Sequence, residues 1–166
     1  MNNLNHYYDS EEIRRVVSVV VLNEDSVLSR ISGLFSARGY NIHSLTVAPI
    51  AENKKYSRIT IVTKGDKRIS DQITKQLNKL IPVLRVNEHV NFIEKDTVLI
   101  KIPIEQSLSD LYVVAKTFNG IVQTITETSI VLSATDDPVR IQNFIKAIQR
   151  FKPIEVVRSG SIAIER

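Results

Sequence analysis

The hydrophobic pattern of the first half of the chain alternates between strand-like runs and helical periodicity. A nearly continuous β-branched run over residues 16–22 is typical of a central strand that is covered on both faces. Four apolar residues then follow at spacings of three and four: Leu28, Ile31, Leu34 and Phe35. This spacing predicts a short amphipathic helix with one face on a sheet. Gly39 marks its end, because glycine tolerates a positive φ angle after a helix.

The remaining elements of the first half are expected in the order strand, strand, helix, strand. Their ranges are 42–47, 58–63, 69–80 and 83–90, with a polar loop over 51–56 and a turn over 64–66. The same order returns after about 80 residues, from a strand at 97–104 to a closing strand at 153–157. We therefore predict an α+β chain of two ferredoxin-like βαββαβ domains in tandem. Each domain has a four-stranded antiparallel sheet with both helices on one face.

These patterns also predict the domain boundaries. Residues 1–13 are polar and without periodicity, so they are expected to form a flexible N-terminal tail. Residues 14–93 form the first domain, and residues 94–166 form a C-terminal ferredoxin-like domain. Apolar residues on both faces of the sheet would leave a large apolar surface on a single chain. We therefore expect a homodimer formed through the first domain.

Composition excludes several classes of function. The 166 residues are 43% hydrophobic, as in an ordinary globular protein, and contain no cysteine, which excludes disulfides and thiolate metal sites. The three histidines, His6, His43 and His89, lack the spacing of metal ligands. No apolar run approaches the roughly 18 residues needed to cross a bilayer, and the N-terminus lacks the apolar core of a signal peptide. We expect a cytoplasmic protein that binds neither metal nor membrane.

The net charge of +4 does not indicate nucleic-acid binding, because charges of both signs are dispersed along the chain. The βαββαβ order also occurs in RNA-recognition domains, which stack bases on aromatic side chains of the central strands. The corresponding strands here, SRITIVTK at residues 57–64 and SIVLSAT at residues 129–135, contain no aromatic residue. We therefore expect no nucleic-acid partner.

Catalytic motifs are missing as well. The sequence has no nucleophile elbow, no phosphate-binding loop and no recognisable motif of paired carboxylates. His43 is the one tempting general base, but a lone histidine on a strand is more often a surface or interface residue. The sequence predicts a protein without catalytic residues.

The two ends of the first helix carry the candidate binding residues. Asn23 lies before the helix and Asn41 after it, and a helix of about a dozen residues separates its ends by roughly 18 Å. Two protomers related by a two-fold axis can bring both asparagines to one ligand, whereas one protomer cannot. Free backbone N–H groups near Val27 and Leu28 would favour a carboxylate. Ordinary capping and turn roles explain the same residues, with Asp25 or Ser26 as the cap.

Specific segments carry a family resemblance. These are NEDSVLSRISGLFSARGYNIHSLTVAP at residues 23–49, SRITIV at 57–62, KQLNKL at 75–80, VLRV at 83–86 and IEVVRSG at 154–160. They closely resemble the regulatory small subunit of acetolactate (acetohydroxyacid) synthase. The resemblance extends from residue 14 to about residue 162, and its N-terminal half looks like an ACT domain.

The resemblance implies a non-catalytic subunit that binds the catalytic large subunit of the synthase and raises its activity. It also implies feedback inhibition by valine, or a related branched-chain amino acid, in branched-chain amino acid biosynthesis. Thiamine diphosphate, magnesium and FAD would belong to the catalytic partner, and this chain would hold no cofactor. The alternative is a stand-alone amino-acid-sensing ACT protein that regulates another enzyme.

In the family that it resembles, the effector lies at the interface of two ACT domains. Six residues are carried over by motif to this effector site: Asn23, Ser26, Val27, Leu28, Asn41 and Ile42. One position departs from the family pattern, which usually has glycine where this chain has Ser26. Glycine lets a backbone approach a ligand closely, whereas a serine hydroxyl can cap the helix and compete for its N–H groups. We therefore expect Ser26 to weaken valine sensitivity without affecting activation.

Overall fold

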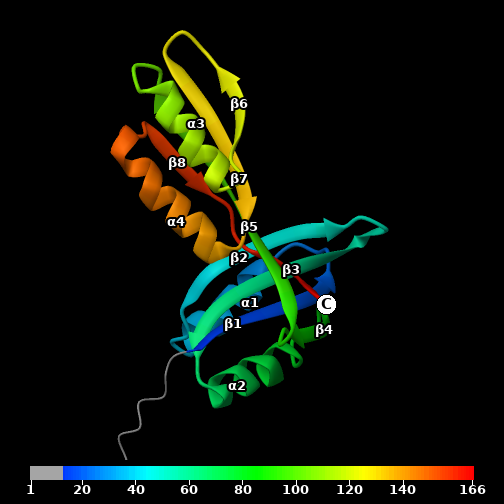
Figure 1. The fold of residues 1–166 in the computed structure, drawn as a ribbon. Coiled ribbons are helices and arrows are strands. Elements are labelled where there is room, and N and C mark those ends of the chain that lie inside the picture. Colours follow the sequence, from blue (N-terminus) through cyan, green and yellow to red (C-terminus); the bar gives the residue numbers. More distant parts are fainter. Residues whose placement is uncertain (1–12) are drawn as a thin grey trace, which may run out of the picture. The chain divides into compact units, whose positions relative to one another are not determined.

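The computed structural model describes residues 13–166, which form two compact units divided between Val90 and Asn91 (Figure 1). The predicted N-terminal tail lies outside the described residues except for Ile13, which begins the first strand. No helix within residues 13–166 is both long enough and apolar enough to cross a membrane.

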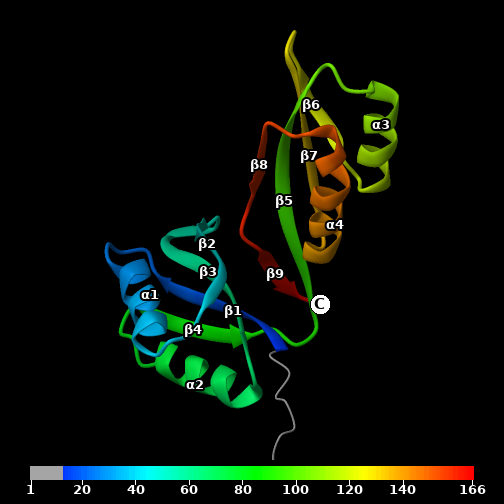
Figure 2. The ribbon, with the colours of Figure 1, turned by 90° about the vertical axis from the view of Figure 1, so that its left-hand side faces the viewer.

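The first unit has the predicted βαββαβ order. Its elements are β1 (Ile13–Leu22), α1 (Val27–Ala37), β2 (Ile42–Ile50), β3 (Asn53–Gly65), α2 (Lys67–Leu77) and β4 (Val83–Glu88). The four strands form an antiparallel sheet in the order β2-β3-β1-β4, so β2 and β4 are its edges. Both helices cover the same face of the sheet (Figure 2). The ferredoxin-like fold predicted for this half is confirmed.

The strand β1 explains how this unit is held together. Val17, Val19 and Val21 alternate along it and pack into the core between the sheet and the helices. Ile31 and Phe35 of α1 are fully buried in the same core, as the helical spacing predicts. The continuous β-branched run thus corresponds to a central strand, paired with β3 on one side and β4 on the other.

Several boundaries in the first unit differ from the sequence prediction; for example, β2 continues to Ile50 and β4 ends at Glu88, two residues before the predicted end. The polar stretch 51–56 is not a loop, because β3 begins at Asn53 and only Ala51 and Glu52 form the turn. Pairing depends on backbone groups, and the polar side chains of residues 53–55 are exposed, so they do not oppose it. The helix α2 ends at Leu77, three residues before the predicted end at residue 80. It begins where the Asp66 carboxylate accepts a hydrogen bond from the Ile69 N–H at 2.8 Å.

The second unit repeats the fold and adds one strand. Its elements are β5 (Phe92–Pro103), α3 (Leu108–Thr117), β6 (Ile121–Ile125), β7 (Ser129–Asp136), α4 (Pro138–Ile148), a 3-10 turn (Gln149–Phe151), β8 (Glu155–Arg158) and β9 (Ile162–Glu165). The order β6-β7-β5-β8 matches that of the first sheet, and β9 also pairs with β5. The sequence prediction missed β9, whose four residues are too short for periodicity to reveal. Pairing with β9 also explains why β5 begins at Phe92 and not at residue 97.

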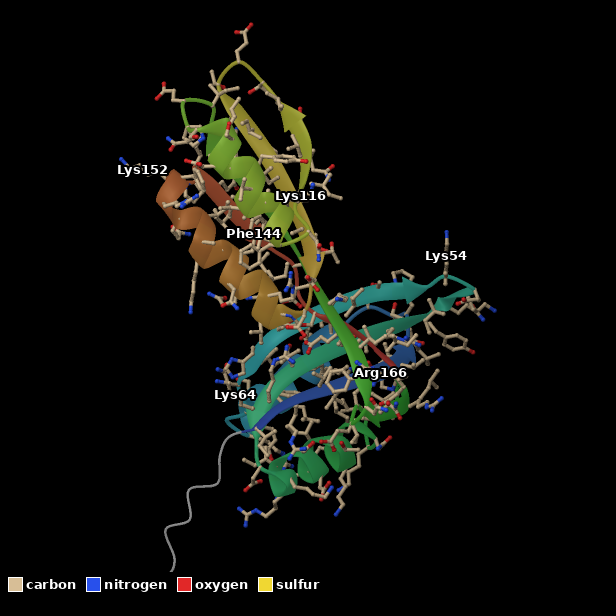
Figure 3. All side chains as sticks on the ribbon, in the orientation of Figure 1. Lys54, Lys64, Lys116, Phe144, Lys152 and Arg166 are labelled. Carbon is tan, nitrogen blue, oxygen red and sulfur yellow. The ribbon has the colours of Figure 1, made fainter. Side chains whose placement is uncertain are left out.

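The core of the second unit lies between the sheet and the helices α3 and α4. Phe144 of α4 is fully buried and points toward the sheet (Figure 3). Its ring stacks on Phe118 with the ring centroids 5.4 Å apart. Val98, Ile100 and Ile102 alternate on the helix-facing side of β5 and complete this core. Each unit therefore has a hydrophobic core of its own.

Candidate functional site

The turn between β1 and α1 is fixed to the hairpin that joins β2 and β3. Asn23 donates its backbone N–H to the Lys55 carbonyl at 2.8 Å and its side-chain amide to the Lys54 carbonyl at 3.0 Å. Lys54 projects outward from that hairpin (Figure 3). Within residues 13–166, Asn23 Oδ1 has no hydrogen-bond partner and is therefore available to a donor. Asn23 thus holds the turn in place with its amide nitrogen and presents an acceptor to solvent.

Ser26, the residue before α1, has a left-handed backbone with φ of 69° and ψ of −5°. Its side chain makes no capping hydrogen bond, so the expected hydroxyl cap is not formed. Serine caps use an extended backbone, and the left-handed conformation of Ser26 does not place Oγ over the N–H groups of the first turn. A non-glycine residue in this region costs roughly 1–2 kcal/mol. Ser26 therefore occupies a position whose left-handed backbone glycine adopts most readily.

The first turn of α1 carries no side chain of its own that compensates the positive end of the helix. Val27 is buried under the helix, whereas Leu28 is 44% exposed beside it. No acidic residue lies in this turn, and no side chain caps it. The first N–H groups of a helix have no intrahelical acceptor, and the helix dipole adds partial positive charge there. The end of α1 near Ser26 is thus suited to a carboxylate beside an exposed aliphatic side chain.

The other end of α1 leads into the edge strand β2. Gly39 has φ of +68°, which confirms the helix end expected from the sequence. The Tyr40 hydroxyl donates to Gln72 on α2 at 2.9 Å, and this hydrogen bond holds the segment that follows α1 against α2. The Asn41 carbonyl accepts a hydrogen bond from Thr63 Oγ1 at 2.8 Å, while Asn41 itself is exposed. Ile42 is half-buried and packs against the core.

The structure therefore separates the six predicted residues into two groups. Asn23 and residues 26–28 lie at the start of α1, whereas Asn41 and Ile42 lie beyond its end. The eleven residues of α1 span about 16 Å, so one protomer does not bring both groups to a single small ligand.

Sequence reasoning missed the residues that support these groups. The carbonyls of Lys54 and Lys55 hold Asn23, and Thr63 holds Asn41. Each of these hydrogen bonds joins residues more than twenty positions apart and ends on a backbone carbonyl. No sequence motif marks such an acceptor, because a backbone carbonyl is present at every position.

Comparison with known proteins decides the family. Residues 17–85 match the family model described as an AHAS small subunit-like ACT domain, and residues 95–166 match that of the small subunit of acetolactate synthase. The acetolactate synthase small subunit of Buchnera aphidicola (subsp. Schizaphis graminum) is 40% identical, covering 93% of this chain and 99% of the relative. The chain belongs to the acetolactate synthase small-subunit family.

Two further small subunits support this assignment. The acetolactate synthase isozyme 3 small subunit of Escherichia coli is 37% identical, covering 93% of this chain and 96% of the relative. The crystal structure of the acetolactate synthase small subunit of Thermotoga maritima superposes with a TM-score of 0.86 at 28% identity. That superposition covers 93% of this chain and 98% of the other. The family is the regulatory small subunit, and the catalytic activity resides in the large subunit.

No group of three or more histidine, aspartate or glutamate side chains suited to a metal occurs within residues 13–166. His43, the one candidate base, is an exposed residue of the edge strand β2.

Proposed function

We propose that this chain binds the thiamine-diphosphate-dependent large subunit of acetolactate synthase, raises its activity and makes it sensitive to inhibition by valine. The support is similarity over nearly the whole chain to proteins named acetolactate synthase small subunit. Thiamine diphosphate, magnesium and FAD belong to the large subunit in this proposal.

The effector site that we propose is shared between two chains. Asn23, Ser26, Val27 and Leu28 of one protomer meet Asn41 and Ile42 of the other. The single observation that carries this arrangement is that the two groups lie at opposite ends of α1, about 16 Å apart. The effector carboxylate lies at the start of α1, its ammonium group donates to asparagine oxygens, and its aliphatic side chain contacts Leu28.

This arrangement requires a homodimer formed through the first unit. We propose that this dimer acts in the cytoplasm. Joining the two groups needs a second α1 and a second β2, as in a two-fold symmetric interface. The position of β2 at the edge of its sheet supports the proposal, because its outer side is not hydrogen-bonded to another described strand.

Reconstitution tests this function. The purified chain is mixed with the catalytic large subunit from the same source, and acetolactate formation is measured with and without valine. We expect the chain alone to be inactive, the large subunit to gain activity on mixing, and valine to lower that gain. If the chain binds valine but neither binds nor activates the large subunit, it is an ACT sensor for another enzyme and the proposal fails.

A further inference from the structure

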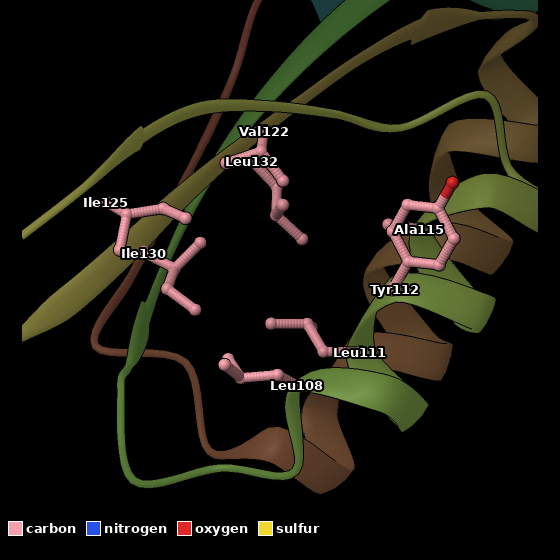
Figure 4. Close-up of a pocket in the computed structure, with 8 residues that line it drawn as sticks. All are labelled: Leu108, Leu111, Tyr112, Ala115, Val122, Ile125, Ile130 and Leu132. Atoms are coloured by element: carbon pink, nitrogen blue, oxygen red, sulfur yellow. The ribbon is translucent and has the colours of Figure 1, made fainter.

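A cavity of about 210 Å³ opens in the second unit between α3 and the β6–β7 hairpin (Figure 4). Its rim is formed by exposed side chains of α3 and β6, namely Leu108, Tyr112, Val122 and Ile125. Its floor is formed by four side chains that are at most 3% exposed: Leu111, Ala115, Ile130 and Leu132. Because these four also belong to the core of the unit, the cavity reaches into the core and is more than a shallow surface depression.

The lining of the cavity favours an apolar occupant. It offers almost no polar surface, and the side chains of Leu108, Leu111, Ile125 and Ile130 surround one central space (Figure 4). A bound water needs two to four polar partners, whereas an apolar cavity of about 150 Å³ stays dry and binds a benzene ring. On that scale, a cavity of about 210 Å³ accepts a hydrocarbon group of about eight carbon atoms.

One charged group lies beside the rim of this cavity. Leu108, Tyr112 and Lys116 are spaced four residues apart, so they share one side of α3. Lys116 Nζ lies 5.7 Å from the centroid of the Tyr112 ring, which lines the cavity. Within residues 13–166, Lys116 makes no ion pair with an acidic side chain. Its ammonium group is therefore available to an anion at the rim.

No acidic side chain of α3 or β6 compensates this ammonium group. Asp110, the acidic residue of α3, is six positions from Lys116 and lies on another side of the helix. The sequence of β6, IVQTI, carries no charge. The partial negative charge at the C-terminus of a helix is confined to the last turn, and Tyr112 precedes that turn of α3. The position over the Tyr112 ring therefore favours an anionic group.

These two features together define the class of ligand. We propose that the cavity binds an aliphatic carboxylate of about eight carbon atoms, with its chain between Leu111 and Ile130 and its carboxylate beside Lys116. An amino acid does not fit, because its own ammonium group would meet that of Lys116. The site uses residues of the second unit alone, so it is separate from the effector site proposed at α1 and takes a different class of ligand.

Isothermal titration of the full chain with straight-chain carboxylates tests the fit of the aliphatic tail. Burial of one methylene group tightens binding about fourfold, so affinity should rise from butanoate through hexanoate to octanoate. The rise should level off beyond about eight carbon atoms, when the cavity is full. Val122→Phe fills the rim and should weaken octanoate binding, whereas Val113→Phe, exposed on α3 outside the cavity, should not. Equal affinities along the series overturn the proposal.

Lys116→Gln tests the carboxylate contact. This substitution should weaken octanoate binding on the order of tenfold, as for loss of a charged hydrogen bond, and leave octan-1-ol binding unchanged. Lys146→Gln, which removes an exposed charge from α4, is the matched control, and far-ultraviolet circular dichroism verifies the fold of each variant. Equal octanoate binding by the unaltered chain and Lys116→Gln overturns the proposal. So does octanoate binding that falls as the concentration of the chain or of the large subunit is raised, because a protein surface would then occupy the cavity.

Discussion

Asp96 and Asp136 lie directly opposite each other on β5 and β7, and each carboxylate has its own cationic partners. Arg158 donates to Asp96 Oδ2 through Nη2 at 2.6 Å, and Ser161 donates to Asp96 Oδ1 at 2.6 Å. Lys95 Nζ lies 2.8 Å from Asp136 Oδ1, and Arg140 Nε lies 2.7 Å from Oδ2 of the same carboxylate. Like charges that face each other across a sheet destabilise it unless they are neutralised. The two clusters therefore offset the repulsion between the two buried carboxylates.

The Asp136 cluster makes the stability of the second unit depend on pH. The hydrogen bond from Lys95, together with those from the Asp137 backbone and Arg140, holds the pKa of Asp136 well below its usual range. Because the pKa is lower in the folded state than the unfolded value of about 3.9, this stabilisation is complete above about pH 5. It is lost progressively as the pH falls below the unfolded pKa.

Asp136→Asn should lower the free energy of unfolding at pH 7 by about 1–3 kcal/mol, because it leaves Lys95 and Arg140 without their partner. Urea unfolding at pH 7 and pH 3 measures this loss and should show a smaller difference at pH 3. Asp71→Asn is the control, because the Lys67–Asp71 pair is exposed and should contribute less than about 1 kcal/mol. Equal effects of the two substitutions at pH 7 would contradict the assignment.

Two glycines should respond in opposite ways to alanine. A Cβ at Gly120 would lie 2.9 Å from the Ala115 carbonyl oxygen, which also accepts the Gly120 N–H. Gly120→Ala should therefore destabilise the second unit by about 1–3 kcal/mol. Gly33 lies within α1 with no atom in the path of a Cβ, so Gly33→Ala should stabilise the chain by about 0.5–1 kcal/mol. Chemical unfolding of both variants measures the two signs, and a loss of stability in both would refute the contrast.

Ser26→Gly should relieve backbone strain. The left-handed conformation at Ser26 costs a serine roughly 1–2 kcal/mol, part of which is offset by the greater freedom of glycine in the unfolded chain. We expect a net gain in the free energy of unfolding of about 0.5–1 kcal/mol. Ser29→Gly is the matched control within α1 and should lose about 0.5 kcal/mol. A stability loss for Ser26→Gly would show that the turn changes conformation in the variant.

The same substitution should strengthen the response to valine. Ser26 places a Cβ and a hydroxyl beside the proposed carboxylate site. If they displace one hydrogen bond to the effector, binding weakens by about 1–3 kcal/mol, or on the order of tenfold to a hundredfold. Ser26→Gly should therefore lower the valine concentration needed for inhibition and leave activation unchanged. Valine titration of the reconstituted enzyme measures both quantities, and equal inhibition with serine and glycine would mean that the site accommodates the hydroxyl.

Asn41→Ala should abolish valine inhibition while the chain stays folded and still activates the large subunit. Asn41 is exposed, and its carbonyl, which the substitution keeps, makes the hydrogen bond to Thr63. Asn143→Ala, an exposed asparagine of the second unit, is the control. Isothermal titration with valine and activity of the reconstituted enzyme give the two readouts. Unchanged valine affinity in Asn41→Ala would remove Asn41 from the effector site.

The repeating fold could be predicted from the sequence because burial of one face of each helix or strand determines the spacing of hydrophobic residues along the chain. Val17, Val19 and Val21 lie in one core, as do Ile31 and Phe35 one helical turn apart. The conformation of Ser26 could not be predicted, since serine before a helix usually caps it and only the path of the surrounding turn forces a positive φ. The hydrogen bond from Asn23 to the Lys54 carbonyl could not be predicted either, because it depends on where the distant β2–β3 hairpin lies in the fold.

The strand β5 has consequences for the order in which the protein acquires its structure during synthesis. The pairing of the first sheet uses no residue beyond His89, so this segment can fold while the second half of the chain is still being made. In contrast, Phe92–Lys95 must wait for Ile162–Glu165, the last of the described strands to be made. A nascent chain arrested before residue 162 would leave the start of β5 unpaired, including the half-exposed Ile93, as a site for chaperones or aggregation. During translation the first unit can thus fold before the second, and the second unit is the one exposed to chaperone binding or aggregation until β9 is made.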